Sequence, residues 1–374
     1  MEQTLTKPTD LTKRKHFDIL DGSLACVLFI VLQYVLAFII ALTGGLKNKF
    51  LYDLFSAIMQ LSFIGSVVLI SKIRKVDWIE ACNFKKKVDG KIVLYALGFA
   101  VISLVLFTDA TSAFMAFLEK IGYSSPLNTG SYAEYNQITN FGEYVVSIIT
   151  VCIIPPICEE TLFRGAVLNS FRGLNKWVGI FISGFCFMIM HGNPDQTIHQ
   201  FILGVVLGYI AWETRNIWVC ILIHAINNLI AITITFAYSI INTGANAGAI
   251  EGATEVATYS WSDIIYTAIS GVLTAALGIY LVIKLTKKLK SHINSKNQTA
   301  TTLTEQTAET INQPEMLVTQ DGQTTVINQT ANAEPEYQAK PSKQKLVLTI
   351  LTYVAFVAYF IKEWVGYLLL GLGL

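Results

Sequence analysis

Six polar residues inside three apolar stretches of the chain have the side chains needed to hydrolyse an amide bond. The first stretch ends with Glu159, Glu160 and Arg164, shortly after the pair Pro155 and Pro156. Glu160 and Arg164 are four residues apart, so they share a helical face and can form an ion pair. Glu159 points about 100° away from Glu160. One carboxylate is therefore predicted to be paired, and the other is available for chemistry.

Two further apolar stretches contribute imidazole and amide groups. One ends with Phe187 and His191, and another contains His224 and Asn228, one turn apart on the same helical face. A carboxylate can take a proton from water, an imidazole can orient that water or a metal ion, and neutral donors can stabilise an oxyanion. The sequence therefore predicts hydrolytic chemistry shared by three helices.

The proline pair and the length of the fifth apolar stretch constrain how these helices meet. Two prolines loosen a helix, which a membrane segment tolerates only where neighbours or water satisfy the freed backbone groups. His191 lies about 21 Å along a helix from Trp177, nearer the outer membrane face than Glu159 if both spans are straight. The span is therefore expected to tilt or to start below the membrane surface.

The composition indicates that the helices cross a membrane. Of 374 residues, 53% are hydrophobic and 14% are charged, whereas soluble domains carry about a quarter charged residues. The apolar residues occur in blocks of about 20, the length that crosses the hydrocarbon core. We predict an all-α, polytopic transmembrane helical bundle of about eight core spans plus a C-terminal apolar helix. The predicted spans are 24–43, 50–71, 91–118, 142–163, 177–191, 196–213, 217–238 and 262–285, followed by 346–372.

Basic residues are concentrated in alternate loops, which predicts a cytoplasmic N-terminus because cytoplasmic loops hold the excess of Lys and Arg. Lys47 and Lys49 are the main exceptions. The net charge of +1 gives no electrostatic reason to expect nucleic acid as a partner. The six cysteines form no CxxC pair, so neither a disulfide framework nor a thiolate metal site is expected.

The chain divides into six predicted regions. Segment 291–343 is rich in Thr, Gln, Asn and Ala, and such a composition cannot bury enough apolar surface to offset the entropy of ordering. The last apolar block contains Lys362 and Glu363, which leaves open whether it spans fully. The regions are a polar cytoplasmic N-terminus (1–18), N-terminal spans (19–141), a catalytic membrane core (142–238), a further span (239–290), a disordered cytoplasmic segment (291–343) and a C-terminal apolar helix (344–374).

Other polar residues are assigned structural roles. Pro194 interrupts the helix between His191 and His199, so a shared ligand face for the two histidines is not expected. Asn227 could act as an oxyanion donor but points to a different face from Asn228. His292 is expected to be solvated.

The three motifs together resemble the CPBP family of intramembrane endopeptidases, the CAAX protease and bacteriocin-processing proteins, which is related to the type II CAAX prenyl proteases. They occur in the family's order over about 70 residues. The motifs are EExxxR at Glu159, Glu160 and Arg164, FxxxH at Phe187 and His191, and HxxxN at His224 and Asn228.

The resemblance implies a role for each motif residue. It implies that Glu159 activates the catalytic water, that His191 helps to hold this water, and that His224 and Asn228 stabilise the oxyanion. The residues implied to be structural are Glu160, Arg164 and Phe187.

A divalent metal ion is an open alternative, since the family is often labelled as metalloproteases. Glu159, His191 and His224 could supply three ligands of a zinc site that keeps one open position. The oxyanion donors would then have to come from elsewhere. Both metal-dependent and metal-free activation of water remain open from the sequence.

The resemblance also implies where the protein works and on what. A bacterial cell membrane, contact with lipid, and a lipidated or membrane-associated peptide or protein substrate are expected. Bacterial relatives are associated with bacteriocin immunity, peptide maturation and the regulation of membrane sensors, so a membrane sensor is a candidate partner. The alternative is a non-catalytic membrane scaffold that binds a sensor kinase or a peptide. A transporter is disfavoured because no inverted repeat of broken helices is apparent.

Overall fold

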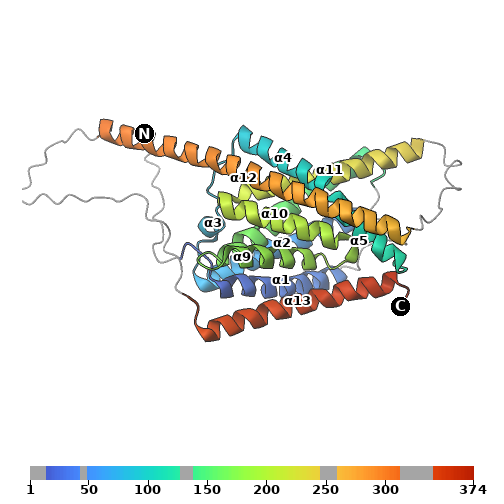
Figure 1. Cartoon of the computed structure of the whole chain (residues 1–374). Coiled ribbons are helices and arrows are strands. Elements are labelled where there is room, and N and C mark those ends of the chain that lie inside the picture. The colour runs from blue at the N-terminus through green and yellow to red at the C-terminus, as the bar shows by residue number, and fades with distance from the viewer. Residues whose placement is uncertain (1–13, 43–48, 127–137, 245–258, 312–339) are drawn as a thin grey trace, which may run out of the picture.

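The apolar blocks form helices, because a helix satisfies its own backbone hydrogen bonds where lipid offers no partners. The computed structural model describes residues 14–42, 49–126, 138–244, 259–311 and 340–374, and every named element in these ranges is a helix (Figure 1). The predicted all-α helical bundle is confirmed. The first elements are α1 (Ile19–Leu42), α2 (Lys49–Arg74), α3 (Trp78–Ala81), α4 (Gly90–Leu106) and α5 (Thr108–Lys120).

The middle of the chain contains short and irregular helices that follow one another closely. They are α7 (Phe141–Ser147), the π-helix η2 (Ile148–Ile153), α8 (Ile154–Glu160), the π-helix η3 (Thr161–Leu168), α9 (Lys176–Met190), the 3₁₀-helix η4 (Pro194–Gln196) and α10 (Thr197–Thr214). Three long helices complete the described chain: α11 (Ile217–Gly244), α12 (Trp261–Ile311) and α13 (Lys343–Gly371).

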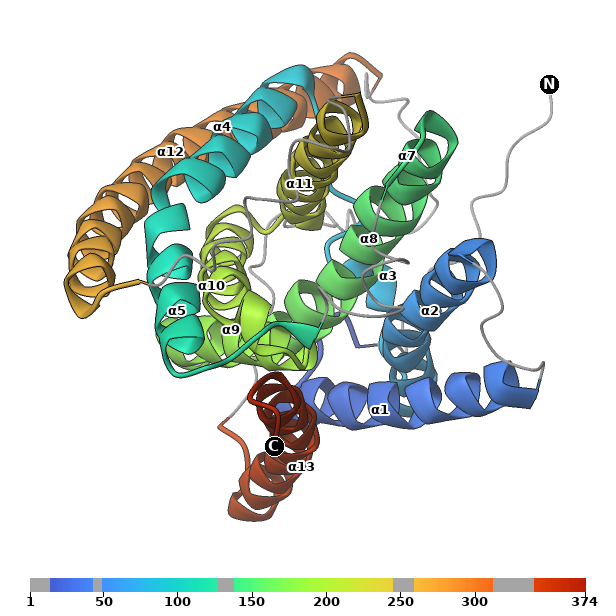
Figure 2. The same ribbon diagram turned by 90° about the vertical axis from the view of Figure 1, so that its right-hand side faces the viewer.

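Seven helical segments are long and apolar enough to cross a membrane, which agrees with a polytopic membrane protein. The predicted blocks 177–191 and 196–213 are not among the seven. They correspond to α9, which has only 15 residues, and to α10. Helix α10 lies inside the bundle, in contact with α5, α9, α11 and α12 (Figure 2). The seven segments are 19–42, 53–74, 90–120, 141–168, 217–241, 261–298 and 343–371.

Two glycines allow α9 and α10 to touch along their backbones. A Cβ atom added to Gly204 would lie 2.9 Å from the Cα and carbonyl oxygen of Gly184. A side chain larger than hydrogen at Gly204 would therefore separate the two helices. This close crossing fixes α9, whose last turn leads directly to His191.

Helix α12 extends beyond its predicted end and into the segment predicted to be disordered. It is helical to Ile311, so the prediction of disorder is wrong for 291–311, and the remaining residues 312–339 lie outside the described chain. Polar contacts to the core hold the extension: Asp89, before α4, accepts from Lys296 and from His292, whose Nε2 lies 2.9 Å away. His292 is therefore an ion-pair partner and is mostly covered, contrary to the prediction that it is solvated.

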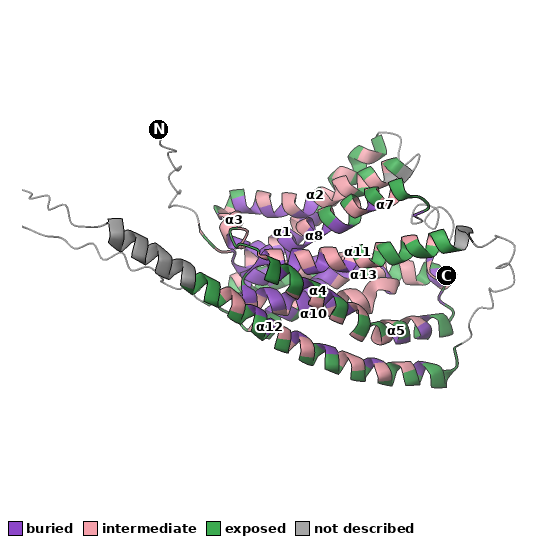
Figure 3. Cartoon of the chain, turned by 90° about the horizontal axis from the view of Figure 1, so that it is seen from above, coloured by how far each residue is buried: buried purple, intermediate pink, exposed green. Residues whose placement is uncertain are grey.

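Helix α13 packs along α1 and α9, and polar contacts hold it near both ends. Lys345 lies 2.6 Å from the buried carboxylate of Asp18, which also pairs with Arg14. Trp364 donates its indole N–H to the hydroxyl of Thr197, at 2.8 Å. Figure 3 shows buried residues concentrated between the helices and exposed residues on the outer faces of helices such as α12. Helix α13 is therefore part of the bundle.

Candidate active site

The segment 141–168 changes helical type around the proline pair. The carbonyl of Val151 would accept from residue 155 in an α-helix and from residue 156 in a π-helix, and both residues are prolines without an N–H. The side chain of Asn228 donates to this carbonyl instead, at 3.0 Å. The helix thus passes through its proline turn without leaving that group unpaired.

Glu160 joins Arg164 and His224 at the centre of the site. Its Oε1 accepts from Arg164 Nη1 at 2.8 Å and lies 3.0 Å from His224 Nδ1. The side chains of Glu160 and Arg164 have no exposed area. Arg164 also donates to the carbonyl of Gly204 at 3.0 Å, which connects η3 to α10. The ion pair predicted from the i,i+4 spacing is present, and it also orients His224 from α11.

Glu159 is the carboxylate that this network leaves uncommitted. It is 5% exposed, and its Oε2 accepts no hydrogen bond within the described part of the chain. Its nearest charged or imidazole partner is His224 Nε2, at 4.0 Å. Gln60 of α2 lies beside it. Because Glu160 takes the Nδ1 edge of His224, the Nε2 edge is the one that faces Glu159.

His191 joins this group through Phe187. It follows the last residue of α9, and its Nδ1 lies 2.9 Å from the carbonyl oxygen of Phe187. The Phe187 ring meets the rings of His191 and His224 edge-on, with centroids 5.1 and 5.6 Å apart. The guanidinium of Arg164 lies 4.4 Å from the Phe187 ring centroid. Phe187 therefore packs beside His191 as predicted, and its ring also contacts Arg164 and His224.

The structure brings most of the predicted site residues together but not all of them. Glu159, Glu160, His224 and Phe187 form one buried cluster, with His191 at its edge. Asn228 shares the helical face of His224, yet its amide N–H is directed to the proline-loosened backbone. Its predicted role at the oxyanion stays a prediction.

Two residues near the cluster were not assigned to the site from the sequence. Asn227 is 4% exposed, and its Nδ2 lies 3.5 Å from His199 Nε2. Pro194 does interrupt the chain between His191 and His199, as expected, but the turn at η4 returns α10 toward α9, so the two imidazoles become electrostatic neighbours. The sequence did contain a signal for Asn227. Residues three and four positions after His224 both lie near the helical face of that histidine, so Asn227 as well as Asn228 could be placed near the site.

The donor set for a metal ion does not converge. Among the described residues, no group of three His, Cys, Asp or Glu side chains is arranged to hold a metal. The Nδ1 atoms of His191 and His224 are engaged with Phe187 and Glu160. These contacts leave the Nε2 atoms of both histidines available, as in metal-binding histidines, so a zinc site at Glu159, His191 and His224 stays a prediction.

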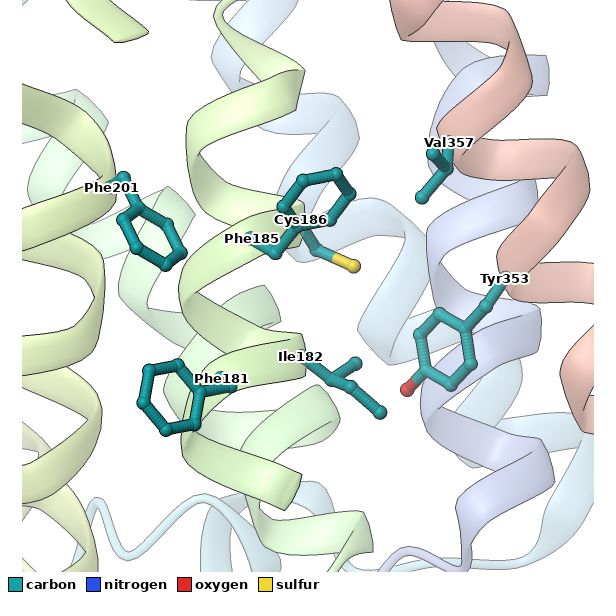
Figure 4. A pocket seen from close by; sticks show the side chains of 7 residues that line it. All are labelled: Phe181, Ile182, Phe185, Cys186, Phe201, Tyr353 and Val357. Atoms are coloured by element: carbon teal, nitrogen blue, oxygen red, sulfur yellow. The ribbon is translucent and has the colours of Figure 1, made fainter. Parts of the chain in front are cut away.

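Two cavities lie near the cluster. The first, of about 460 Å³, is lined by α1, α2 and α13 and by Met190, and Gln60 contributes to its wall. This cavity therefore adjoins both Glu159, through Gln60, and His191, through Met190. The second, of about 360 Å³, lies between α9, α10 and α13 (Figure 4). Its lining is apolar except for Cys186 and Tyr353. The cavity therefore fits a hydrocarbon chain and contains no catalytic group.

Comparisons with known proteins agree with this location of the site. Residues 141–230 match the family described as type II CAAX prenyl endopeptidase, Rce1-like. An uncharacterised 24.3 kDa protein of Escherichia coli is 26% identical over 88 residues, which are 22% of this chain and 41% of that protein. The match thus spans less than half of the relative. No solved structure matches the chain. Residues 141–230 are thus similar to the type II CAAX prenyl endopeptidases, and this segment contains Glu159, His191 and His224.

Proposed function

We propose that the protein is an intramembrane endopeptidase in which Glu159 activates water for attack on a peptide bond. The observation that carries this proposal is a buried carboxylate that faces the Nε2 atom of His224 and forms no ion pair with Arg164, while the carboxylate next to it holds both Arg164 and His224 through its Oε1 atom. Such a group is suited to act as a general base within hydrogen-bond reach of a water molecule.

The first step moves one proton and forms one bond. Glu159 takes a proton from water as the water oxygen bonds to the carbonyl carbon, and the carbonyl electron pair becomes an oxyanion. The Nε2 edge of His224 faces this centre, and when it carries a proton it can donate to the oxyanion. His191, which packs against Phe187, orients the water or the substrate carbonyl in this scheme.

The second step breaks the peptide bond and restores the carboxylate. Protonated Glu159 gives its proton to the leaving nitrogen, the oxyanion collapses, and the products are a carboxylic acid and an amine. Glu160 and Arg164 take no part in proton transfer in this scheme. They hold His224 in one orientation, as a carboxylate commonly does for a catalytic imidazole.

The substrate is proposed to be a membrane-associated or lipidated peptide or protein segment, cleaved within the bilayer of a bacterial cell. The cavity lined by α1, α2 and α13 supports this substrate class, because its wall is mostly apolar with a few polar side chains and it adjoins the Glu159 side of the site. Bacteriocin immunity, peptide maturation and control of a membrane sensor are the proposed contexts.

The test is the loss of turnover in Glu159→Gln, which keeps the shape of the side chain. Purified wild type and variant are incubated with a pool of synthetic apolar peptides, and products are identified by mass spectrometry. We expect cleavage by wild type only, with unchanged melting temperatures. Cleavage by Glu159→Gln at the wild-type rate would refute the proposal.

Metal content is measured on the same preparations. The proposed water activation by Glu159, with oxyanion stabilisation by His224, requires no metal, so we expect turnover to survive removal of divalent ions by a chelator. Loss of turnover with a chelator, restored by zinc, would replace this scheme by a metal-dependent one.

A further inference from the structure

Two neighbouring asparagines on α11 face different partners. Asn228 donates to the Val151 carbonyl at 3.0 Å. Neither Pro155 nor Pro156 can donate to that carbonyl, so Asn228 supplies a hydrogen bond that the backbone cannot. Its amide N–H is therefore committed to holding α11 against the proline turn.

Asn227 is buried and only partly satisfied. Its Nδ2 lies 3.5 Å from His199 Nε2, while its Oδ1 is buried and accepts no hydrogen bond within the described chain. A buried carbonyl oxygen without a donor is unfavourable, so this oxygen is suited to a ligand that brings an N–H group.

The position of Asn227 relates it to the reacting centre. It lies three residues after His224, on an adjoining part of the same helical face. His224 in turn faces Glu159 at 4.0 Å. Asn227, with His199 of α10 beside it, therefore borders the site.

We propose that Asn227 binds substrate by accepting a hydrogen bond from a backbone N–H of an extended peptide, and that His199 is a positioning residue that fixes the Asn227 amide. The inference rests on the proposed peptidase function and deepens it. A side-chain amide that binds main chain does not read the substrate's side chains. The recognised feature is therefore an unfolded stretch of peptide, whose N–H groups are not already used within a helix.

The experiment pairs protein variants with peptides that lack one N–H each. The probe is a fluorescently labelled apolar peptide of twelve residues, chosen from the synthetic pool as the tightest binder. Single N-methyl groups are placed at each position in turn. Binding is measured by fluorescence anisotropy in the inactive Glu159→Gln background, so that cleavage does not interfere.

One N-methyl position is expected to weaken binding about fivefold when Asn227 is present and to have no effect in Asn227→Ala. If Asn227→Ala does not fold, Asn227→Leu fills nearly the same space. His199→Ala is expected to reduce this coupling, and His199→Gln, which keeps a polar partner for the Asn227 amide, is expected to restore part of it.

Asn228→Ala is the matched control one residue away. It is expected to lower the melting temperature, because the Val151 carbonyl loses its donor, and to keep the coupling. The inference is overturned if no peptide position couples to Asn227, or if the coupling is lost in Asn228→Ala and kept in Asn227→Ala. If no N-methyl position couples to Asn227 but cleavage still depends on Glu159, this inference is wrong and the proposed peptidase function stands. If one position couples to Asn227 but no cleavage depends on Glu159, the proposed peptidase function is wrong and the peptide-binding role of Asn227 stands.

Discussion

Arg164 is the residue on which the buried network depends. Its guanidinium contacts the carboxylate of Glu160, the carbonyl of Gly204 and the ring of Phe187. An arginine keeps its charge in proteins, so the interior must supply permanent partners for it. Four helical segments, α8, η3, α9 and α10, meet at this one side chain.

We therefore expect removal of the Arg164 charge to act mainly by destabilising the folded site, because Arg164 takes no direct part in the proposed reaction. We expect Arg164→Met to lower the free energy of unfolding by about 3–5 kcal/mol, because Glu160 would remain as an unpaired buried charge. Equilibrium unfolding in mixed micelles measures this loss. The control is Lys85→Met, which breaks the exposed Lys85–Glu80 pair and should leave stability unchanged. Equal stability of the two variants would contradict this account.

At the residue scale the sequence predicted local pairs better than distant ones. The Glu160–Arg164 pair follows from helical spacing, and Phe187 beside His191 follows in the same way. The partner of Asn228 did not follow, because Val151 lies 77 positions away on another helix. Spacing gives the face on which a residue lies, whereas the partner depends on which helix packs there.

Helices α9 and α10 show how small residues fix the position of a catalytic side chain. Gly204→Val would place new atoms against the backbone of Gly184, which cannot move away as a flexible side chain can. We expect the variant to fold less stably and to lose at least tenfold in turnover, since His191 would shift with α9. Melting temperature and cleavage rate are the measurements. The control is Gly366→Ala on α13, where nothing lies within 4 Å of an added Cβ atom. We expect it to lower neither the melting temperature nor the cleavage rate.

The contact between α12 and the start of α4 should respond to acid. Lys296 lowers the pKa of Asp89, with further hydrogen bonds from the Ile92 N–H and from His292. A carboxyl whose pKa is lowered by folding adds stability above its unfolded pKa of about 4 and loses this contribution as pH falls toward its folded pKa. Wild type should thus be more stable than Asp89→Asn at pH 7, and the difference should shrink below about pH 4.

Melting temperatures of both proteins across this pH range check the prediction. A difference that is constant from neutral to acid pH would show that the ionised carboxylate of Asp89 does not hold α12.

At the scale of helices, the sequence predicted the apolar blocks well but did not predict that α12 continues through the polar residues 291–311. Segment 291–311 has the composition of a disordered chain, yet it continues an established helix, so no new helix nucleus is needed. The contacts of Asp89 with His292 and Lys296 join residues about 200 positions apart. Composition alone does not contain such contacts.

Across the whole molecule, basic loops that alternate along the sequence meet at one end of the bundle. Asn216 donates to the carbonyl of Lys87 at 3.1 Å, and Lys290 lies 2.8 Å from Glu213. Lys176 pairs with the same Glu213. Figure 1 shows α3 toward this end, whereas the end of α5 and the start of α12 lie at the other. The positive-inside rule predicts that the basic end lies in the cytoplasm.

Labelling from one side of the membrane tests this orientation. All six cysteines are buried, so the native chain should react little with a membrane-impermeant maleimide. We expect Lys120→Cys to be labelled in intact spheroplasts and Lys85→Cys only after the membrane is opened. The reverse pattern would place the N-terminus outside the cytoplasm.

The shortness of α9 ties the site to the thickness of the membrane. Fifteen residues rise about 22 Å, less than the roughly 30 Å of a typical hydrocarbon core. If α9 starts at one membrane surface, His191, just after this helix, is expected to lie short of the far surface. The remaining thickness of the membrane is then expected to separate bulk water from the site on that side. The length of the lipid acyl chains should therefore affect how readily water reaches the site. A thinner bilayer shortens the path from bulk water to Glu159 for each water molecule that hydrolysis consumes.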